Sequence, residues 1–197
     1  APRLKAMHIG IDFDNTIVSY DRVFHRVALE QGVIPATVEP TKLAVRDWLR
    51  AQDQEDLWTE MQGYVYGARM ADAEAYPGVR EFLRWARAAG LPVSIISHKT
   101  EWPFRGPRYD LHDAARVWIT TFLRDDAGPL VPPENVYFET TKEAKWTRIA
   151  SAACTHFIDD LPEILFSEAF PAGTQRILFD PERHHGPVGK ATLIVQN

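Results

Sequence analysis

The stretch from His8 to Asp21 constrains the fold of this chain more than any other. Its first half is an apolar run, Ile9 to Ile11, which ends abruptly in acid at Asp12 and Asp14. A short apolar run bounded by polar turn-forming residues indicates a buried strand, most naturally a parallel one covered on both faces. Open α/β sheets bind ligands at the carboxyl ends of such strands. Two carboxylates this close repel each other, so we interpret them as ligands of a divalent cation; the alternative is a solvated turn.

Composition limits the classes of protein that this chain can belong to. Its 197 residues allow one sizeable domain, or a core domain with a smaller insertion. The net charge of -5 and the lack of a basic run argue against a nucleic-acid-binding face. The single cysteine, Cys154, excludes a disulfide within the chain, fits a reducing compartment and is expected to be buried. No apolar stretch reaches membrane-spanning length, so we expect a cytoplasmic protein without a membrane partner.

Hydrophobic periodicity divides the chain into two parts. Residues 19–76 carry apolar side chains at helical intervals in three stretches, and Pro77 and Gly78 close this block. We predict that residues 19–76 form a small helical insertion, or cap, over the sheet. The core domain is then formed by residues 1–18 and 77–197.

From Gly78 onwards the pattern alternates between helix and strand. Strands are predicted at residues 91–96, 135–138, 155–158 and 175–179, with an edge strand at 190–196, and helices at 79–89, 110–123 and 140–153. Thr140 and Glu143 have the spacing of a capping box at the start of the last helix. The fold class that follows is α/β, a doubly wound (Rossmann-like) parallel sheet of about five strands.

Polar side chains with related chemistry follow three of these strands. Asp12 and Asp14 end the first strand, Ser97 ends the second, and Asp159 and Asp160 end the fourth. In a parallel sheet these ends lie on one edge, so groups distant in sequence can converge. Such a set suits phosphoryl transfer, in which a carboxylate attacks phosphorus, cations neutralise the phosphate oxygens, and a second acid protonates the leaving oxygen.

Together these motifs resemble those of the haloacid dehalogenase superfamily. The resemblance rests on Asp12-x-Asp14-x-Thr16, on Ser97, on a lysine near a helix start and on Phe157-Ile158-Asp159-Asp160, in that order over residues 8–160. It implies Asp12 as nucleophile and Asp14 as general acid and base. It also implies Mg²⁺ held by Asp12, the Asp14 backbone carbonyl and Asp159, with Asp160 as a further ligand or an orienting group. Thr16, Ser97 and the lysine are expected to contact the substrate. Members that cleave carbon–halogen bonds typically lack the second acid, so Asp14 favours a phosphatase.

Several assignments remain open at the level of sequence. Lys142 and Lys145 both lie near the predicted helix start, three residues apart and therefore on one helix face, and we slightly favour Lys145 as the phosphate-binding lysine. His98 contacts the leaving group or is simply a positioned loop residue. Lys99, Arg105 and Arg108 bind a second anionic group, or, more simply, keep the loop soluble. Trp102 and Phe104 stack on a base or sugar, or, more simply, pack the loop down.

The predicted function is a Mg²⁺-dependent phosphomonoester hydrolase that acts on a small phosphorylated metabolite, a sugar phosphate or a nucleotide, through an aspartyl-phosphate. Two alternatives are a phosphotransferase or mutase of the same fold and a non-catalytic protein that binds a phosphorylated ligand. The paired acids argue against the last of these, because a mere binder gains nothing from two carboxylates that repel phosphate.

Overall fold

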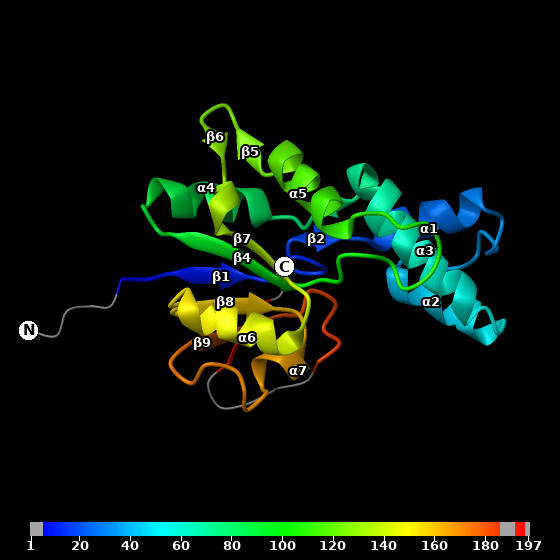
Figure 1. Cartoon of the computed structure of the whole chain (residues 1–197). Coiled ribbons are helices and arrows are strands. Elements are labelled where there is room, and N and C mark those ends of the chain that lie inside the picture. Colours follow the sequence, from blue (N-terminus) through cyan, green and yellow to red (C-terminus); the bar gives the residue numbers. More distant parts are fainter. Residues whose placement is uncertain (1–5, 186–191, 196–197) are drawn as a thin grey trace, which may run out of the picture. The chain divides into compact units, whose positions relative to one another are not determined.

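The computed structural model describes residues 6–185 and 192–195 of the chain (Figure 1). The chain forms two compact units. The first contains the residues up to Ile17, Tyr76–Lys99 and the residues from Leu123 onwards. The second contains Val18–Ala75 and Thr100–Phe122. The predicted insertion, drawn at residues 19–76, therefore shares its unit with a later segment, and its role as a cap stays a prediction.

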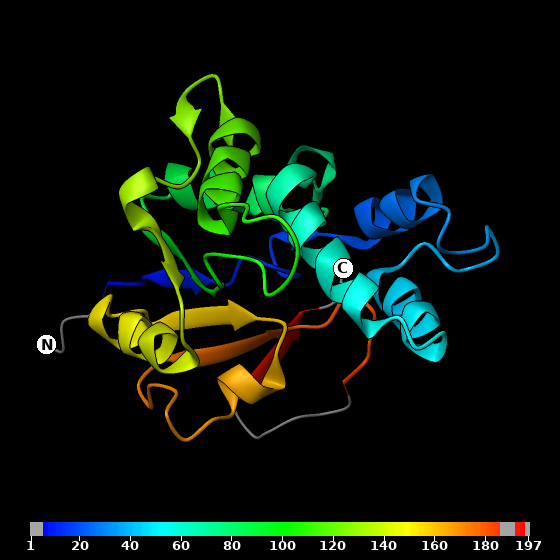
Figure 2. The ribbon, with the colours of Figure 1, turned by 45° about the vertical axis from the view of Figure 1, so that its right-hand side comes forward.

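The first unit is built on one parallel sheet. Its six strands are β1 (Ile9–Ile11), β4 (Val93–His98), β7 (Val136–Glu139), β8 (His156–Asp159), β9 (Gln175–Phe179) and β10 (Thr192–Val195). They are arranged in the order β10-β9-β8-β1-β4-β7, and every neighbouring pair is parallel. Figure 2 shows β8, β9 and β10, coloured from yellow to red, running in the same direction. The predicted α/β class and parallel sheet are confirmed, with β10 as one of the two edge strands.

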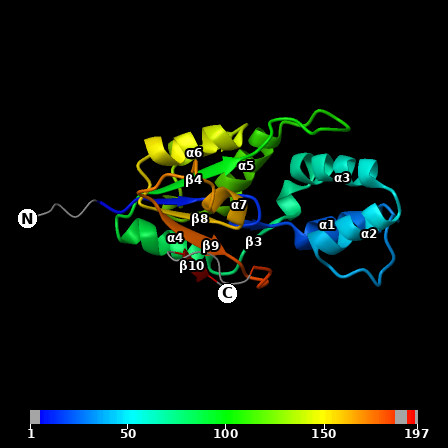
Figure 3. The same ribbon diagram turned by 90° about the horizontal axis from the view of Figure 1, so that it is seen from below.

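Helices cover both faces of this sheet, as a doubly wound fold requires. Figure 3 shows α6 (Lys142–Ser151) on one side and α4 (Val79–Ala88) on the other. On the α6 side, which also holds α7 (Pro162–Leu165), a buried cluster joins Ile96, Ile149, Cys154, Phe157, Leu165, Phe170 and Leu178. Before β7 the chain forms a short ribbon, β5 (Arg124–Asp125) with β6 (Gly128–Pro129), and the 3₁₀ turn η2 (Pro133–Asn135).

The α4 side of the sheet is less completely covered. A cavity of about 500 Å³ lies there, and its apolar lining includes Ile158 and Ile177 from β8 and β9 and Phe82 and Trp85 from α4. The two isoleucines are half-buried, although the strands that carry them lie inside the sheet. The expectation of strands buried on both faces therefore holds on the α6 side and is only partly met on this one.

Two helix ends show how local sequence sets the boundaries. Gly90, two residues after the end of α4, has a φ of +68°. Its backbone N–H donates to the carbonyl oxygen of Arg87, and the N–H of Leu91 donates to the carbonyl oxygen of Ala86. These two bonds form a Schellman motif. At the start of α6 the capping residue is Thr141, whose hydroxyl accepts from the N–H of Ala144 at 3.0 Å. The prediction that Thr140 forms this cap was wrong, because Thr140 lies one residue too early to accept from the first turn.

The second unit is helical. It contains α1 (Asp21–Glu30), α2 (Lys42–Ala51), α3 (Glu55–Ala68), the 3₁₀ turn η1 (Met70–Asp72) and α5 (Leu111–Phe122), with the two-residue ribbon β2 (Val18–Ser19) and β3 (Glu74–Ala75). A side chain at Gly67 would meet the Tyr109 ring at 2.3 Å, so this glycine lets the later segment pack directly on α3. The helices predicted within residues 19–76 are confirmed. Their partner, α5, was predicted as a helix of the core.

Within the part of the chain that the structure describes, no helix combines the length and the apolar composition needed to cross a bilayer.

Replacement of Gly10 by alanine is expected to lower the free energy of unfolding by about 1–3 kcal/mol, the usual cost of overpacking. A Cβ at this position in β1 would lie 2.5 Å from the Phe157 ring and 2.9 Å from the Cys154 sulfur. Gly173→Ala is the control, because a Cβ there meets nothing within 4 Å. Urea denaturation of both variants measures the difference. Equal stability of the two variants would contradict the tight packing of β1.

Candidate active site

The site forms where three neighbouring strands end. Asp12 follows β1 directly, Ser97 is the penultimate residue of β4, and Asp159 is the last residue of β8. Because β1 lies between β4 and β8, with Ile11 level with Ile95 and Ile158, the three side chains reach the same edge. The predicted convergence of these strand ends is therefore present in the structure.

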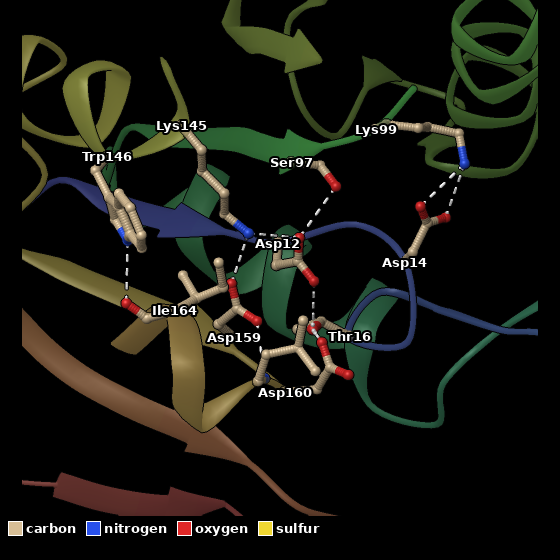
Figure 4. A network of polar contacts seen from close by, with 11 residues as sticks. Asp12, Asp14, Thr16, Ser97, Lys99, Lys145, Trp146, Asp159, Asp160 and Ile164 are labelled. Carbon is tan, nitrogen blue, oxygen red and sulfur yellow. Dashed lines mark hydrogen bonds and ion pairs between the residues drawn. The ribbon is translucent and has the colours of Figure 1, made fainter. Parts of the chain in front are cut away.

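The Asp12 carboxylate is held by hydrogen bonds at both oxygens (Figure 4). Its Oδ1 accepts from the Ser97 hydroxyl at 3.0 Å and from the Lys145 ammonium at 2.9 Å. Its Oδ2 accepts from the Thr16 hydroxyl at 3.1 Å. All four side chains are buried, so Asp12 is fixed in a single orientation away from bulk water.

Lys145 is the lysine that the fold brings to this site. It lies one turn inside α6, its side chain is 2% exposed, and its Nζ is 2.6 Å from Asp159 Oδ2. Lys142, at the start of the same helix, has a side chain 43% exposed and lies 3.9 Å from Glu163. Sequence spacing could not decide which of the two lysines lies at the site, and the structure places Lys145 there. The phosphate-binding role of Lys145 stays a prediction.

Three carboxylates could hold a metal ion together. Each of Asp12, Asp159 and Asp160 offers an oxygen, and these oxygens lie within 4.8 Å of one another. When all three are ionised, Lys145 balances only one of their charges and leaves an excess of two negative charges in a buried site. The Thr16 hydroxyl lies within hydrogen-bonding distance of both Asp12 and Asp160 but has only one hydrogen to donate. A hard divalent cation fits this oxygen set and this charge.

Burial shifts the pKa values of the groups in this cluster. Burial raises the pKa of Asp159 to about 6, the charge of Asp12 adds to the increase, and Lys145 partly opposes it. Burial, followed by the charges of Asp12 and Asp159, raises the pKa of Asp160 to about 10. Burial alone would lower the pKa of Lys145, but the two carboxylates outweigh burial and raise it. The lysine therefore keeps its proton, while one or more of the aspartates gains one when no cation is bound.

Asp14 lies apart from the three aspartates. Its carboxylate faces Lys99, whose Nζ donates to Oδ1 at 3.1 Å and to Oδ2 at 3.0 Å (Figure 4). Lys99 is buried, and its backbone N–H donates to the carbonyl of Glu139 at the end of β7. The simpler explanation for Lys99, a solubilising loop residue, was therefore wrong. The signal in the sequence was its position two residues after Ser97, which places both side chains on the same side of an extended chain.

The other candidates are His98 and four residues of the loop that follows β4. His98 is half-buried at the last position of β4, and its contact with a leaving group stays a prediction. In the second unit, Arg105 pairs with Glu60 at 3.2 Å, and the Arg108 guanidinium lies 4.3 Å from the centre of the Trp102 ring. Phe104, with 85% of its surface exposed, does not pack the loop down.

Comparison by sequence gives no family. No family model matches the chain, and neither does any curated protein.

Comparison by structure gives a consistent fold. Protein Tyrosine Kinase A from Mycobacterium tuberculosis has a TM-score of 0.61 at 13% identity, over 98% of this chain and 95% of that one. A HAD family hydrolase from Deinococcus radiodurans R1, solved with bound phosphate and sodium, has a TM-score of 0.55 at 16% identity, over 98% and 91%. A predicted phosphoglycolate phosphatase from Haemophilus somnus has a TM-score of 0.53 at 17% identity, over 88% and 85%.

Identities this low establish architecture and nothing finer. The similarity extends over nearly the whole of each chain, and the ordered motifs found in the sequence fall at the strand ends where the acidic site forms. This chain has the fold of the haloacid dehalogenase-like hydrolases.

Proposed function

We propose that this protein is a Mg²⁺-dependent phosphomonoester hydrolase that acts on a small phosphorylated metabolite through an aspartyl-phosphate on Asp12. The observation that carries the proposal is the environment of Asp12. This buried carboxylate is oriented by the Ser97 hydroxyl and the Lys145 ammonium, and it is one of three aspartates whose oxygens can share a cation. An oriented carboxylate beside positive charge is the arrangement that attack on a phosphate monoester needs.

The reaction follows from the roles of these side chains. An Asp12 oxygen forms a bond to phosphorus while the bond from phosphorus to the leaving oxygen breaks, and Asp14 gives that oxygen a proton. Asp14 then takes a proton from water, whose oxygen attacks phosphorus and releases phosphate and the free Asp12 carboxylate. Ser97 and Lys145 donate hydrogen bonds to the phosphoryl oxygens and so offset the charge that the two carboxylates would otherwise repel.

Asp12, Asp159 and Asp160 are the side chains that would hold Mg²⁺, together with the backbone carbonyl of Asp14. When bound, the cation supplies charge neutralisation at the phosphoryl group and balances the excess negative charge of the cluster. The protein contributes the fixed positions of the three carboxylates. Lys145 holds Asp159 through Oδ2, and the N–H of Leu161 holds it through Oδ1 at 2.9 Å.

Phosphate release from a panel of sugar phosphates, nucleotides and 4-nitrophenyl phosphate tests the proposal. Each substrate is incubated with Mg²⁺ and, separately, with a chelator. Release that requires the metal supports the hydrolase, and the best substrate identifies its class. Tight binding of phosphorylated ligands without turnover would contradict it and favour a binding protein.

A phosphotransferase is the second candidate, because the kinase named above shares this fold. In that case the phosphoryl group passes from Asp12 to an acceptor other than water. Addition of a sugar or alcohol acceptor to the same assay separates the two reactions. A hydrolase releases inorganic phosphate whether or not the acceptor is present, whereas a transferase forms a new phosphate ester.

Mg²⁺ is expected to raise the unfolding temperature more at pH 8 than at pH 5. The folded-state pKa values of Asp159 and Asp160, about 6 and about 10, lie above the usual value of an aspartate. A raised pKa makes the folded state favour the proton, so this stabilisation is complete at low pH and is lost as pH rises through the raised values. The chelated protein therefore loses stability between pH 5 and pH 8, and the cation restores it by binding the ionised carboxylates.

Thermal unfolding at both pH values, with Mg²⁺ and with chelator, measures this effect. The control is Asp160→Asn, which removes the most strongly shifted group and should flatten the pH dependence of the chelated protein. An equal effect of Mg²⁺ at both pH values would contradict the assignment of these aspartates as its ligands.

A further inference from the structure

Lys99 is a buried lysine that the mechanism above does not use. Within the described residues, Lys99 and Lys145 are the two buried lysines, and both lie at the carboxyl edge of the sheet. Lys145 binds Asp12 and Asp159, whereas Lys99 binds Asp14. At the carboxyl edge of the sheet, Asp12 and Asp14, the two carboxylates that react in the proposed mechanism, therefore each contact a different ammonium.

Burial of the lysine and a backbone hydrogen bond fix the position of the contact between Lys99 and Asp14. The lysine side chain is 3% exposed, and the aspartate side chain is 22% exposed. Both Asp14 oxygens accept from Nζ, at 3.1 and 3.0 Å, and Nζ also lies 6.0 Å from the centre of the Phe13 ring. The backbone of Lys99 is fixed by its hydrogen bond to β7. A short two-point contact to a buried ammonium defines where the carboxylate lies.

The position that Lys99 imposes has a chemical consequence. Asp12 and Asp14 are two residues apart, and a carboxylate at Asp14 without a partner could turn towards the same cation as Asp12. Figure 4 shows the Asp14 side chain directed away from the three clustered aspartates and towards Lys99. This leaves its carboxylate outside the metal-binding set, as its proposed role in proton transfer requires.

We propose that Lys99 is a positioning residue that holds the Asp14 carboxylate apart from the metal-binding aspartates, on the side where the leaving group departs. This inference rests on the proposed hydrolase function. It assigns Lys99 neither to the phosphoryl group nor to solubility. Its effect reaches the substrate through Asp14.

Substrates with different leaving groups distinguish a positioning role of Lys99 from a purely structural one. Departure of an alkoxide from a sugar phosphate requires a proton from Asp14, whereas 4-nitrophenolate departs without one. We expect Lys99→Gln and Lys99→Met to lower kcat/KM for an alkyl or sugar phosphate by roughly 10²-fold, the effect of a misplaced catalytic group. For 4-nitrophenyl phosphate, kcat/KM should change by less than about threefold, because this ratio covers only the steps up to leaving-group departure.

Four further variants make the assignment specific. Asp14→Asn should show the same selective loss, and the double variant Lys99→Gln with Asp14→Asn should be no worse than Asp14→Asn alone, because both changes act through one group. Lys99→Arg, which keeps the charge, should restore most of the lost activity. Arg148→Met removes a surface ion pair of 2.8 Å with Glu139 and should lower kcat/KM for neither substrate. Equal losses on both substrates, or additive losses in the double variant, would overturn the proposal.

A second measurement does not depend on turnover. Crystal structures of the wild type and of Lys99→Gln should show the Asp14 carboxylate against Nζ in the first and displaced towards Asp12 or solvent in the second. An unmoved Asp14 carboxylate would overturn the positioning role even if the enzyme is an active phosphatase. A displaced carboxylate in a protein that hydrolyses no phosphate ester would support the positioning role and contradict the proposed function instead.

Discussion

Replacement of Asp12 by asparagine is expected to reduce metal-dependent phosphate release by roughly 10⁴-fold or more, because the carboxamide cannot form the aspartyl-phosphate. Asparagine has nearly the same shape as aspartate. Its amide oxygen can accept from Ser97 and Lys145 in place of Oδ1, and its NH₂ can face the Thr16 hydroxyl, which is able to accept. The variant therefore tests the nucleophile with little change in packing.

The decisive measurement is made on the intermediate as well as on turnover. Wild-type protein mixed with a substrate and quenched in acid should carry a phosphoryl group on the peptide that contains Asp12, and the variant should carry none. Retention of substantial turnover by Asp12→Asn under saturating Mg²⁺ would show that the covalent mechanism is wrong.

Asp180→Asn is the matched control for this experiment. Asp180 is also a buried aspartate that directly follows a strand of the same sheet, β9. Its oxygens accept from the backbone N–H groups of His184 and His185, at 2.8 and 3.0 Å, and it is absent from the aspartate group that could hold a metal. Its replacement should lower stability by about 1–3 kcal/mol through weakened hydrogen bonds while turnover of the folded protein stays near that of the wild type.

The positions of Asp12, Ser97 and Asp159 were predictable because they depend on topology alone. An apolar run followed by a polar residue marks the carboxyl end of a parallel strand, and right-handed crossovers bring those ends to one edge whatever the helices between them do. No knowledge of individual side-chain directions is needed for this step. The choice between Lys142 and Lys145 did need such knowledge, since both lie on one face of α6 and only the packing of that helix decides which of them is buried.

What the sequence left undetermined depends on close approaches between distant segments. The second unit includes residues 100–122 because Gly67 on α3 allows the chain at Tyr109 to pack against the helix, and no periodicity within residues 100–122 carries that information. The burial of Lys99 is a similar case. A lysine in a polar loop is usually solvated, and its pairing with Asp14 arises only when the ends of β1 and β4 lie side by side.

Lys145→Met is expected to lower the free energy of unfolding by about 3–5 kcal/mol at pH 8 in the presence of a chelator. Methionine fills a similar volume, so the loss comes from charge. The substitution leaves Asp12 and Asp159 buried without the ammonium that each of them contacts, and ionised carboxylates without a counter-charge are costly in a buried site. Lys142→Met is the control on the same helix. Its side chain is 43% exposed and its ion pair is long, so a change of at most about 0.5 kcal/mol is expected.

The size of this loss should depend on pH and on partner charge in a defined way. At pH 5 the deficit of Lys145→Met should shrink, because Asp159, whose pKa is already about 6, then accepts a proton and no longer needs a cation. At pH 8 a second substitution, Asp159→Asn, should recover part of the stability, since it removes one of the two carboxylates left without a counter-charge. Urea denaturation of the single and double variants at both pH values measures these differences. A Lys145→Met protein within about 1 kcal/mol of the wild type at pH 8 would mean that water or protonation already satisfies the aspartates, and that the lysine is held there for catalysis alone.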